Sequence, residues 1–181
     1  MLQRWFVGVA AIGVALSMSP SAGAQESKPI GLSIRAGIFM PSQSEARDEG
    51  KNWIGGGLEF KLRDLGFGIA DPGASTSLTA SVDFMGMGPF QHIPVMVNYV
   101  GRRNEVYWTV GAGIGFVRDE EITSIGPPAI RESRNSTALA YQFGLGYDFQ
   151  RGRNAVFVEA RYIGSGKSVV NGLGLFVGMR L

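Results

Sequence analysis

Apolar and polar residues alternate one by one along most of the chain, the pattern of a β-strand with two different faces. The alternation recurs about every 20 residues, and no segment after the N-terminal region keeps a helical period. The eight alternating runs cover residues 30–40, 54–62, 77–84, 92–99, 106–116, 138–149, 156–162 and 171–181. An even number of such strands, joined by polar connections, predicts an all-β fold: an eight-stranded antiparallel up-and-down β-barrel.

The two faces of these strands differ in size as well as in polarity. Along the run 138–149 every second residue is Leu, Tyr or Phe, and the other face is mostly small. In a soluble, lipocalin-like barrel these large side chains would point inward. They would overfill the interior of an eight-stranded barrel. The row Gly111, Gly113 and Gly115 would also weaken a water-facing strand without a gain in packing. We therefore expect a transmembrane barrel whose large apolar residues face lipid.

Aromatic residues of the apolar face fall into two groups when successive strands run in opposite directions. The group at the strand ends nearest the chain termini is Phe60, Tyr99, Trp108, Tyr147 and Phe149. The group at the opposite ends is Phe84, Phe116, Tyr141 and Tyr162. Aromatic side chains are enriched at both membrane interfaces. We expect two aromatic belts, with both termini on the periplasmic side.

The lengths of the connections follow this topology in part. Segments 101–105 and 150–154 are short, as periplasmic turns should be, and the longest connection, 118–136, falls on the outer side. Segment 64–75 is long for a periplasmic turn, which predicts a bulge or a shifted strand boundary there. Pro94 cannot donate a ladder hydrogen bond and weakens the fourth run.

The first 24 residues have the pattern of a secretory signal peptide. Arg4 supplies a positive charge, residues 5–18 are almost continuously apolar, and Ala22-Gly23-Ala24 offers small residues for cleavage. The apolar run is shorter than the roughly 20 residues of a membrane-spanning helix. We expect Sec-type export, cleavage of residues 1–24, and a mature barrel domain of residues 25–181.

Composition narrows the classes of protein further. The 27 glycines accompany 11 Phe, 5 Tyr and 3 Trp, which excludes a disordered glycine-rich linker. The absence of cysteine excludes a disulfide scaffold and a thiolate metal site. Without Arg4 the balance is 16 basic against 15 acidic residues, so we expect no nucleic-acid partner. The pairs Arg102-Arg103 and Arg151/Arg153 are scattered, as is typical of solvated turns.

Charged residues also occur on the small-residue face. Unpaired ions in a narrow lumen are costly, so we expect these residues to pair across strands and close the bore. The alternative is a polar path for small solutes, opened by rearranged pairs. The expected lumen charge network consists of Arg35, Glu59, Lys61, Asp83, Asp148, Glu159, Arg161 and Arg180.

Three pieces of sequence, together with the signal peptide and the eight strands, carry a resemblance to a known family. They are "GIFMPS" (37–42), "FVEARYIGSG" (157–166) and "GLFVGMRL" (174–181). They resemble the OmpA/OmpX-like superfamily of small outer-membrane β-barrels. This resemblance implies the outer membrane of a diderm bacterium, contact with lipid, and recognition of the last strand by the barrel-assembly machinery. The family often ends in Gly-Tyr-Arg-Phe, which Gly178, Met179, Arg180 and Leu181 match with aliphatics replacing both aromatics.

Candidates for catalysis and metal binding are few. Catalytic outer-membrane barrels group a histidine with Ser or Asp near the outer rim, and His92, the sole histidine, is expected near Ser81 and Asp83 on the neighbouring strand. A lone histidine beside a short loop is more often a hydrogen-bonded rim residue. The acidic run 119–121 lacks the glycine turn of a calcium loop. We predict no catalytic residues, no cofactor and no metal.

These observations lead to one expected function and two alternatives. We expect a monomeric, integral outer-membrane barrel with a structural or interaction role, which contributes to envelope integrity and presents segment 118–136 to a surface partner. The first alternative is a small-solute, porin-like channel through the polar lumen. The second is an outer-membrane lipid-modifying enzyme.

Overall fold

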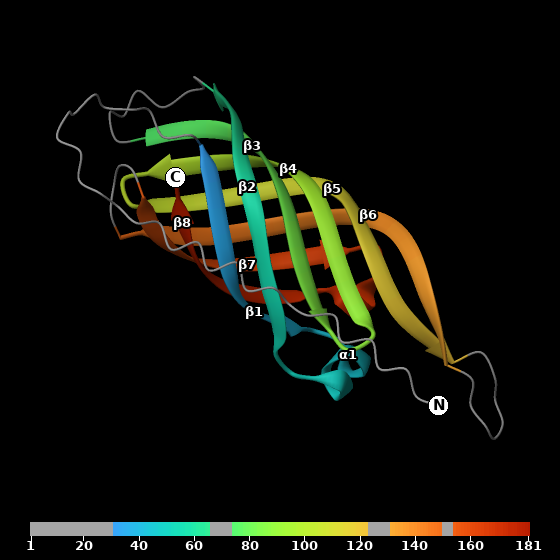
Figure 1. Ribbon diagram of the computed structural model, residues 1–181. Coiled ribbons are helices and arrows are strands. Elements are labelled where there is room, and N and C mark those ends of the chain that lie inside the picture. The colour runs from blue at the N-terminus through green and yellow to red at the C-terminus, as the bar shows by residue number, and fades with distance from the viewer. Residues whose placement is uncertain (1–30, 66–73, 123–130, 150–153) are drawn as a thin grey trace, which may run out of the picture.

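The chain folds into a closed barrel in which each strand pairs with the next in the sequence and β8 pairs with β1. The computed structural model describes residues 31–65, 74–122, 131–149 and 154–181 (Figure 1). The strands are β1 (Leu32–Pro41), β2 (Trp53–Leu65), β3 (Ala74–Met87), β4 (Phe90–Arg103), β5 (Val106–Ile122), β6 (Arg131–Asp148), β7 (Ala155–Ser165) and β8 (Gly172–Arg180). All eight pairings are antiparallel. The predicted eight-stranded up-and-down barrel is confirmed, and the expected signal peptide lies outside the described residues.

Two short helices interrupt the strand pattern at one end of the barrel. They are α1 (Ser44–Glu49), between β1 and β2, and η1 (Ser168–Val170), between β7 and β8. Neither was predicted, because six and three residues are too few to show a helical period. The Arg47 side chain holds α1 against β1 by donating hydrogen bonds to the backbone oxygens of Pro41 and Ser42, each at 2.9 Å. No helix in the described part of the chain is long and apolar enough to cross a membrane.

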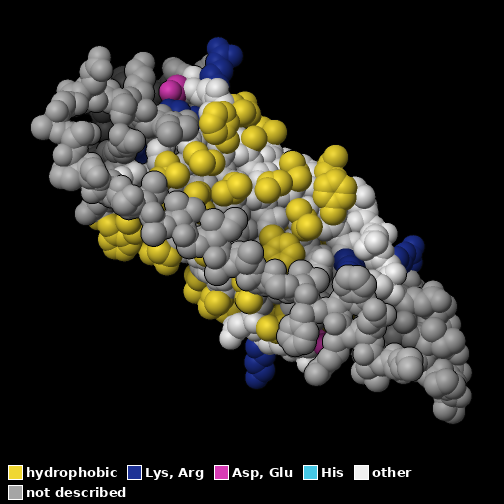
Figure 2. Space-filling view, viewed as in Figure 1, with side chains coloured by type: hydrophobic (Ala, Val, Ile, Leu, Met, Phe, Trp, Pro, Cys, Tyr) yellow, Lys and Arg dark blue, Asp and Glu magenta, His cyan; other side chains and the backbone are white. Residues whose placement is uncertain are grey.

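Side chains alternate between the two faces of the barrel wall as the sequence predicts. Large apolar residues lie outside, so that Leu139 is 68% exposed, whereas Gln142 on the other face is 2% exposed. Figure 2 shows hydrophobic side chains gathered over the middle of the visible outer face, with Lys and Arg toward its ends. The exterior therefore holds the apolar face of the strands, and the middle of the interior holds the polar face.

The two ends of the barrel differ in form. We call the end where β8 finishes, at Arg180, the C-terminal end, and the opposite end the hairpin end. At the hairpin end β5 and β6 run on beyond their other neighbours (Figure 1). Pairing of β4 with β5 stops at Arg118, and pairing of β6 with β7 stops at Ala140. We call the β5 residues 119–122 and the β6 residues 131–138 the hairpin arm.

The hairpin arm corrects the predicted loop 118–136. Both sides of that segment are strand, and β5 and β6 stay in register out to the pair Ile122 and Arg131. Only residues 123–130 remain between the strands, and they lie outside the described residues. The alternation of apolar and polar residues fades beyond position 116 because a strand outside the barrel has no apolar face to bury.

Two predicted irregularities are present in the sheet. The register of β2 against β3 shifts between Lys61 and Arg63, which marks a bulge just before the segment 64–75. At Pro94 the ladder between β3 and β4 breaks, since Asp83 and Phe84 have no paired residue on β4. Pairing of β4 with β5 continues through Pro94, so the missing N–H affects the β3 side alone.

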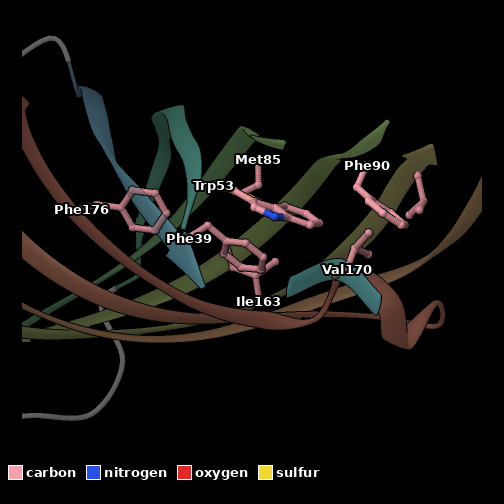
Figure 3. Packing of buried hydrophobic residues seen from close by; sticks show 9 residues of the cluster. Phe39, Trp53, Met85, Phe90, Ile163, Val170 and Phe176 are labelled. Carbon is pink, nitrogen blue, oxygen red and sulfur yellow. The ribbon is translucent and has the colours of Figure 1, made fainter. Parts of the chain in front are cut away.

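The interior at the hairpin end is filled by large apolar side chains, which the sequence analysis did not anticipate. We call this cluster the apolar plug; its buried members are Phe39, Ala46, Trp53, Met85, Phe90, Val117, Ile163, Val170 and Phe176. Figure 3 shows Trp53 between Phe39 and Phe90. The ring centroids of Phe39 and Trp53 are 5.7 Å apart, and those of Trp53 and Phe90 are 6.0 Å apart. With Ala46 from α1 and Val170 from η1, the plug fills this end of the bore.

Candidate functional site

The middle of the barrel is built around Arg35, an inward residue of β1. Its Nε and Nη2 donate hydrogen bonds to the two carboxylate oxygens of Asp83 on β3, each at 2.8 Å. Its Nη1 donates a third to Glu59 Oε2 on β2 at 2.9 Å. Arg35 and Asp83 are both buried. A planar guanidinium that meets a carboxylate at two points is a strong and geometrically specific contact.

A second buried guanidinium, that of Arg161 on β7, completes the charged layer. Its Nη2 lies 3.2 Å from Glu59 Oε2, so this carboxylate oxygen accepts from both arginines. Arg161 also forms an ion pair with Glu159, two residues away on the same strand, and donates from Nη1 to Gln142 Oε1 at 2.9 Å. The predicted lumen charges from β1, β2, β3 and β7 thus meet in one cluster.

Uncharged polar side chains extend this cluster across the bore. Gln142 on β6 donates to Asn98 on β4, and Asn98 Nδ2 donates to Ser81 Oγ at 3.0 Å. Tyr107 on β5 donates its hydroxyl proton to Glu159 Oε2 at 2.8 Å. These contacts connect the strands from β1 to β7 across the bore, so that polar side chains of the interior pair with one another.

Glycines on the middle strand allow side chains two strands apart to meet. Arg35, Gly57 and Asp83 lie in one cross-strand row, and the ion pair passes over Gly57. A Cβ at Gly57 would collide with the Asp83 carboxylate. Two further rows repeat the arrangement: Asn98, Gly111 and Gln142, and Tyr107, Gly146 and Glu159. Glycines on the inward face therefore leave the room in which these interior contacts form.

A second ionic group lies nearer the C-terminal end. Asp148 on β6 is buried and forms ion pairs with both Arg102 on β4 and Arg180 on β8. The Arg180 guanidinium also lies 4.5 Å from the ring centroids of Tyr107 and Phe157. Arg102 corrects the expectation that the pair Arg102-Arg103 belongs to a solvated turn, because β4 continues to Arg103 and turns Arg102 inward.

Lys61 lies apart from both groups. Its Nζ contacts the Asp64 carboxylate at 3.1 Å, and both side chains are exposed. It lines a polar cavity of about 220 Å³ at the C-terminal end, which also reaches Glu59 and Arg180. Among the eight residues expected in the lumen charge network, the structure brings the other seven into these two ionic groups and leaves Lys61 at the mouth.

His92 forms no hydrogen bond with Ser81 or Asp83. It is fully buried, and neither ring nitrogen has a hydrogen-bond partner in the described part of the chain. Its cross-strand neighbour on β3 is Met85, while Ser81 and Asp83 are bonded to Asn98 and Arg35. The expectation of a hydrogen-bonded histidine at the rim is wrong, because β4 begins before His92 and carries it into the interior beside the apolar plug.

The aromatic residues expected in two belts lie on the outer face in two groups. At the C-terminal end Tyr99 and Trp108 have ring centroids 5.3 Å apart, and those of Tyr147 and Phe149 are 5.5 Å apart. Phe60 lies at the same end, opposite Leu32 of β1. Toward the hairpin end Tyr141 and Tyr162 have centroids 6.3 Å apart, and Phe84 and Phe116 are exposed.

The four residues that match the family's terminal signature close the barrel. Met179 is exposed on the outer face and Arg180 points inward to Asp148. Gly178 leaves room for the Phe157 ring. The backbone N–H of Leu181 donates to the Leu32 oxygen at 2.8 Å, so pairing with β1 continues to the last residue.

Comparisons with known proteins give matches among solved structures. The outer membrane protein Ail of Yersinia pestis superposes with a TM-score of 0.44 and 19% identity over 83% of this chain and 98% of that chain. The N-terminal β-barrel domain of Pseudomonas aeruginosa OprF gives 0.49 and 14% over 83% and 96%. The outer membrane enzyme PagL gives 0.46 and 13% over 82% and 99%. No protein-family model and no curated protein matches this chain.

Several residues of the interior site were missed from the sequence. Asn98 and Gln142 lie on the predicted inward face but carry no charge, and Tyr107 resembles an outward aromatic in type. Extending the alternation of the fourth run to position 102 would have placed Arg102 inward. The apolar plug residues gave no such signal, because nothing in a strand's own sequence says which inward positions lie near a capped end.

Proposed function

We propose that the chain is an integral outer-membrane barrel with a structural and interaction role. The observation that carries this proposal is the outer surface, where most outward positions on the strands are large apolar residues and the others are mainly alanine or glycine. A soluble monomer rarely exposes a contiguous apolar patch of more than a few hundred Å². Lipid is the partner that such a continuous band fits best.

The height of the apolar band supports a membrane location. On β5 it runs from Val106 to Phe116, ten residue steps. At about 3.4 Å per residue this is roughly 34 Å along the strand. A tilt of about 40° reduces it to roughly 26 Å along the membrane normal, close to the apolar height of about 25 Å in transmembrane barrels.

Fractionation of cells that express the full chain tests this location. We expect the mature protein in the outer-membrane fraction, with an electrophoretic mobility that changes on boiling because the barrel resists detergent until heated. A protein found in the soluble periplasmic fraction, with no change in mobility, would identify a soluble barrel and overturn the proposal.

The orientation we propose puts the hairpin arm outside the cell and the C-terminal end in the periplasm. The chain has no cysteine, so single cysteines can be labelled cleanly. Ser133→Cys on the arm should react with a membrane-impermeant maleimide on intact cells. Ser75→Cys, exposed at the C-terminal end, should react only after permeabilisation, and the reverse pattern would invert the orientation.

We propose that the lumen is closed to passive diffusion, which disfavours the small-solute channel. The charged layer around Arg35 and Arg161 and the apolar plug lie one above the other, and both consist of buried side chains in contact. Purified protein in planar bilayers should give no conductance above the lipid baseline. Steady single-channel steps from the wild-type protein would restore the channel.

The hairpin arm is the element that we propose meets a surface partner. Residues 131–138 of β6 pair with β5 on one side and with no described strand on the other. A strand at the edge of a sheet can accept an extended segment of another polypeptide. A chain whose arm is replaced by a two-residue turn should assemble normally and lose whatever cell-surface contact the wild type makes.

We propose that this chain is not an enzyme and that the barrel-assembly machinery recognises β8. His92 supports the proposal that the chain is not an enzyme, because neither ring nitrogen reaches an acid or a nucleophile in the described residues.

The terminal signature supports recognition of β8 by the barrel-assembly machinery, and Leu181→Phe tests it. Restoring the aromatic end should raise the assembled, heat-modifiable fraction, and a lower fraction would contradict the proposal.

A further inference from the structure

A groove of about 390 Å³ opens on the outer face at the hairpin end, across β4, β5 and β6. Two cross-strand rows of outward residues form it. The row nearer the middle of the barrel is Ile93, Phe116 and Thr137, and the row beyond it is Gln91, Arg118 and Asn135. The groove therefore passes from apolar to polar within two residues along β4 and β5.

The groove lies where the apolar band ends. Phe116 is the last apolar outward residue of β5 before the hairpin arm, and Arg118 is the next residue on the same face. If the band spans the hydrocarbon layer, Arg118 sits at the depth of the lipid headgroups of the leaflet at the hairpin end. This placement rests on the proposed membrane location.

The chemistry of the outer row suits an anion with several oxygen atoms. Arg118 Nε donates to Ser133 Oγ at 2.7 Å, which fixes the plane of an otherwise exposed guanidinium. The amides of Gln91 and Asn135 flank it on the neighbouring strands. In the described part of the chain no acidic residue lines the groove. A guanidinium flanked by amide and hydroxyl donors is well suited to a phosphate group.

We propose that this groove binds the phosphate of an anionic lipid headgroup, with Arg118 as the anchor and the lipid's acyl chains against Ile93 and Phe116. The apolar row distinguishes a lipid from a free anion, because a soluble phosphate would gain nothing from it. The polar row distinguishes a phosphorylated headgroup from an uncharged one. Both rows lie on rigid, paired strand, so the site exists before the lipid arrives.

Lipid retention measured by native mass spectrometry tests this site. The full-length mature protein is placed in nanodiscs of phosphatidylcholine with a minor fraction of phosphatidic acid. The measured quantity is the number of phosphatidic acid molecules that stay bound when the protein is released from the nanodisc. Arg118→Gln should retain roughly tenfold less than the wild type, since a hydrogen bond to a charged group contributes about that factor. Arg118→Lys should fall between them, because it keeps the charge and loses the planar fork.

The matched control is Arg63→Gln, which removes an exposed arginine at the C-terminal end. It should retain as much lipid as the wild type. Equal retention by Arg118→Gln and the wild type would overturn the site while leaving the membrane proposal intact. Failure of the wild type to enter nanodiscs in its heat-modifiable form would instead overturn the membrane location.

A second arm separates the lipid from free phosphate. In nanodiscs of phosphatidylcholine alone, added inorganic phosphate should not change the NMR chemical shift of the Arg118 Nε–H group. In nanodiscs that also contain phosphatidic acid, the chemical shift should change. Equal movement with inorganic phosphate would overturn the assignment to a lipid.

Discussion

Arg35 and Asp83 form a two-point ion pair inside the barrel, with Nε–Oδ1 and Nη2–Oδ2 distances of 2.8 Å, although their strands are not neighbours. The strand between them contributes Gly57, and the pair passes over the space that this glycine leaves. Both charges are buried. The contact therefore depends on Gly57, because a larger side chain there would block the pair.

Gly57→Ala should destabilise the barrel strongly. The added Cβ would collide with the Asp83 carboxylate and lie 2.8 Å from the backbone oxygen of Val82, so a rotamer change alone cannot relieve it. Overpacking of this kind costs about 1–3 kcal/mol. Urea unfolding from vesicles, followed by tryptophan fluorescence, measures the free energy of unfolding. Gly166→Ala is the control, because its Cβ would have its nearest neighbour at 3.6 Å.

The ion pair itself can be measured by a double-mutant cycle. Arg35→Met leaves Asp83 with only the more distant Arg161, whose Nη1 is 3.9 Å from Oδ2, and should cost about 3–5 kcal/mol of unfolding free energy. Asp83→Leu should cost a similar amount. The double variant should cost clearly less than the sum, because no uncompensated charge remains from the pair. Additive costs would show that the two residues act independently.

A charge on the outer face should be penalised according to depth. Val110, near the middle of the apolar run on β5, is 46% exposed, and in water Val110→Lys would cost little. In a bilayer it should cost about 2–4 kcal/mol, against about 0–1 kcal/mol for Val106→Lys near the end of the run. Unfolding from vesicles measures both. Equal and small effects would contradict the membrane location.

His92→Leu should leave stability unchanged or increase it. Both ring nitrogens are buried without hydrogen-bond partners in the described residues, and such groups cost about 1–3 kcal/mol each when left unsatisfied. Leucine has a similar volume and suits the neighbouring Met85. A loss of more than about 1 kcal/mol would show that His92 makes a polar contact that stabilises the barrel.

Much of the architecture follows from the sequence because strand alternation is a local property. A residue at position i and one at i+2 share a face wherever the strand lies, so Leu139 and Gln142 could be assigned to opposite faces without knowing their neighbours. The steric argument that rows of large residues lie outside needs only the number of strands, and the apolar plug is the exception to it. The eight strands, their order and their two faces were therefore predictable.

The contacts within the lumen required the tertiary structure, because they depend on register between residues far apart in the chain. Asp83 lies 48 residues from Arg35, and a shift of one residue between β1 and β2 would break their row. The full length of β4 placed Arg102 inside the barrel, and the extra length of β5 and β6 made the hairpin arm. The helices α1 and η1 cap one end of the barrel, and the interior is apolar at that end. The sequence by itself determined which side chains face inward. Only the closed sheet decided which of them meet, because closure fixes every register at once.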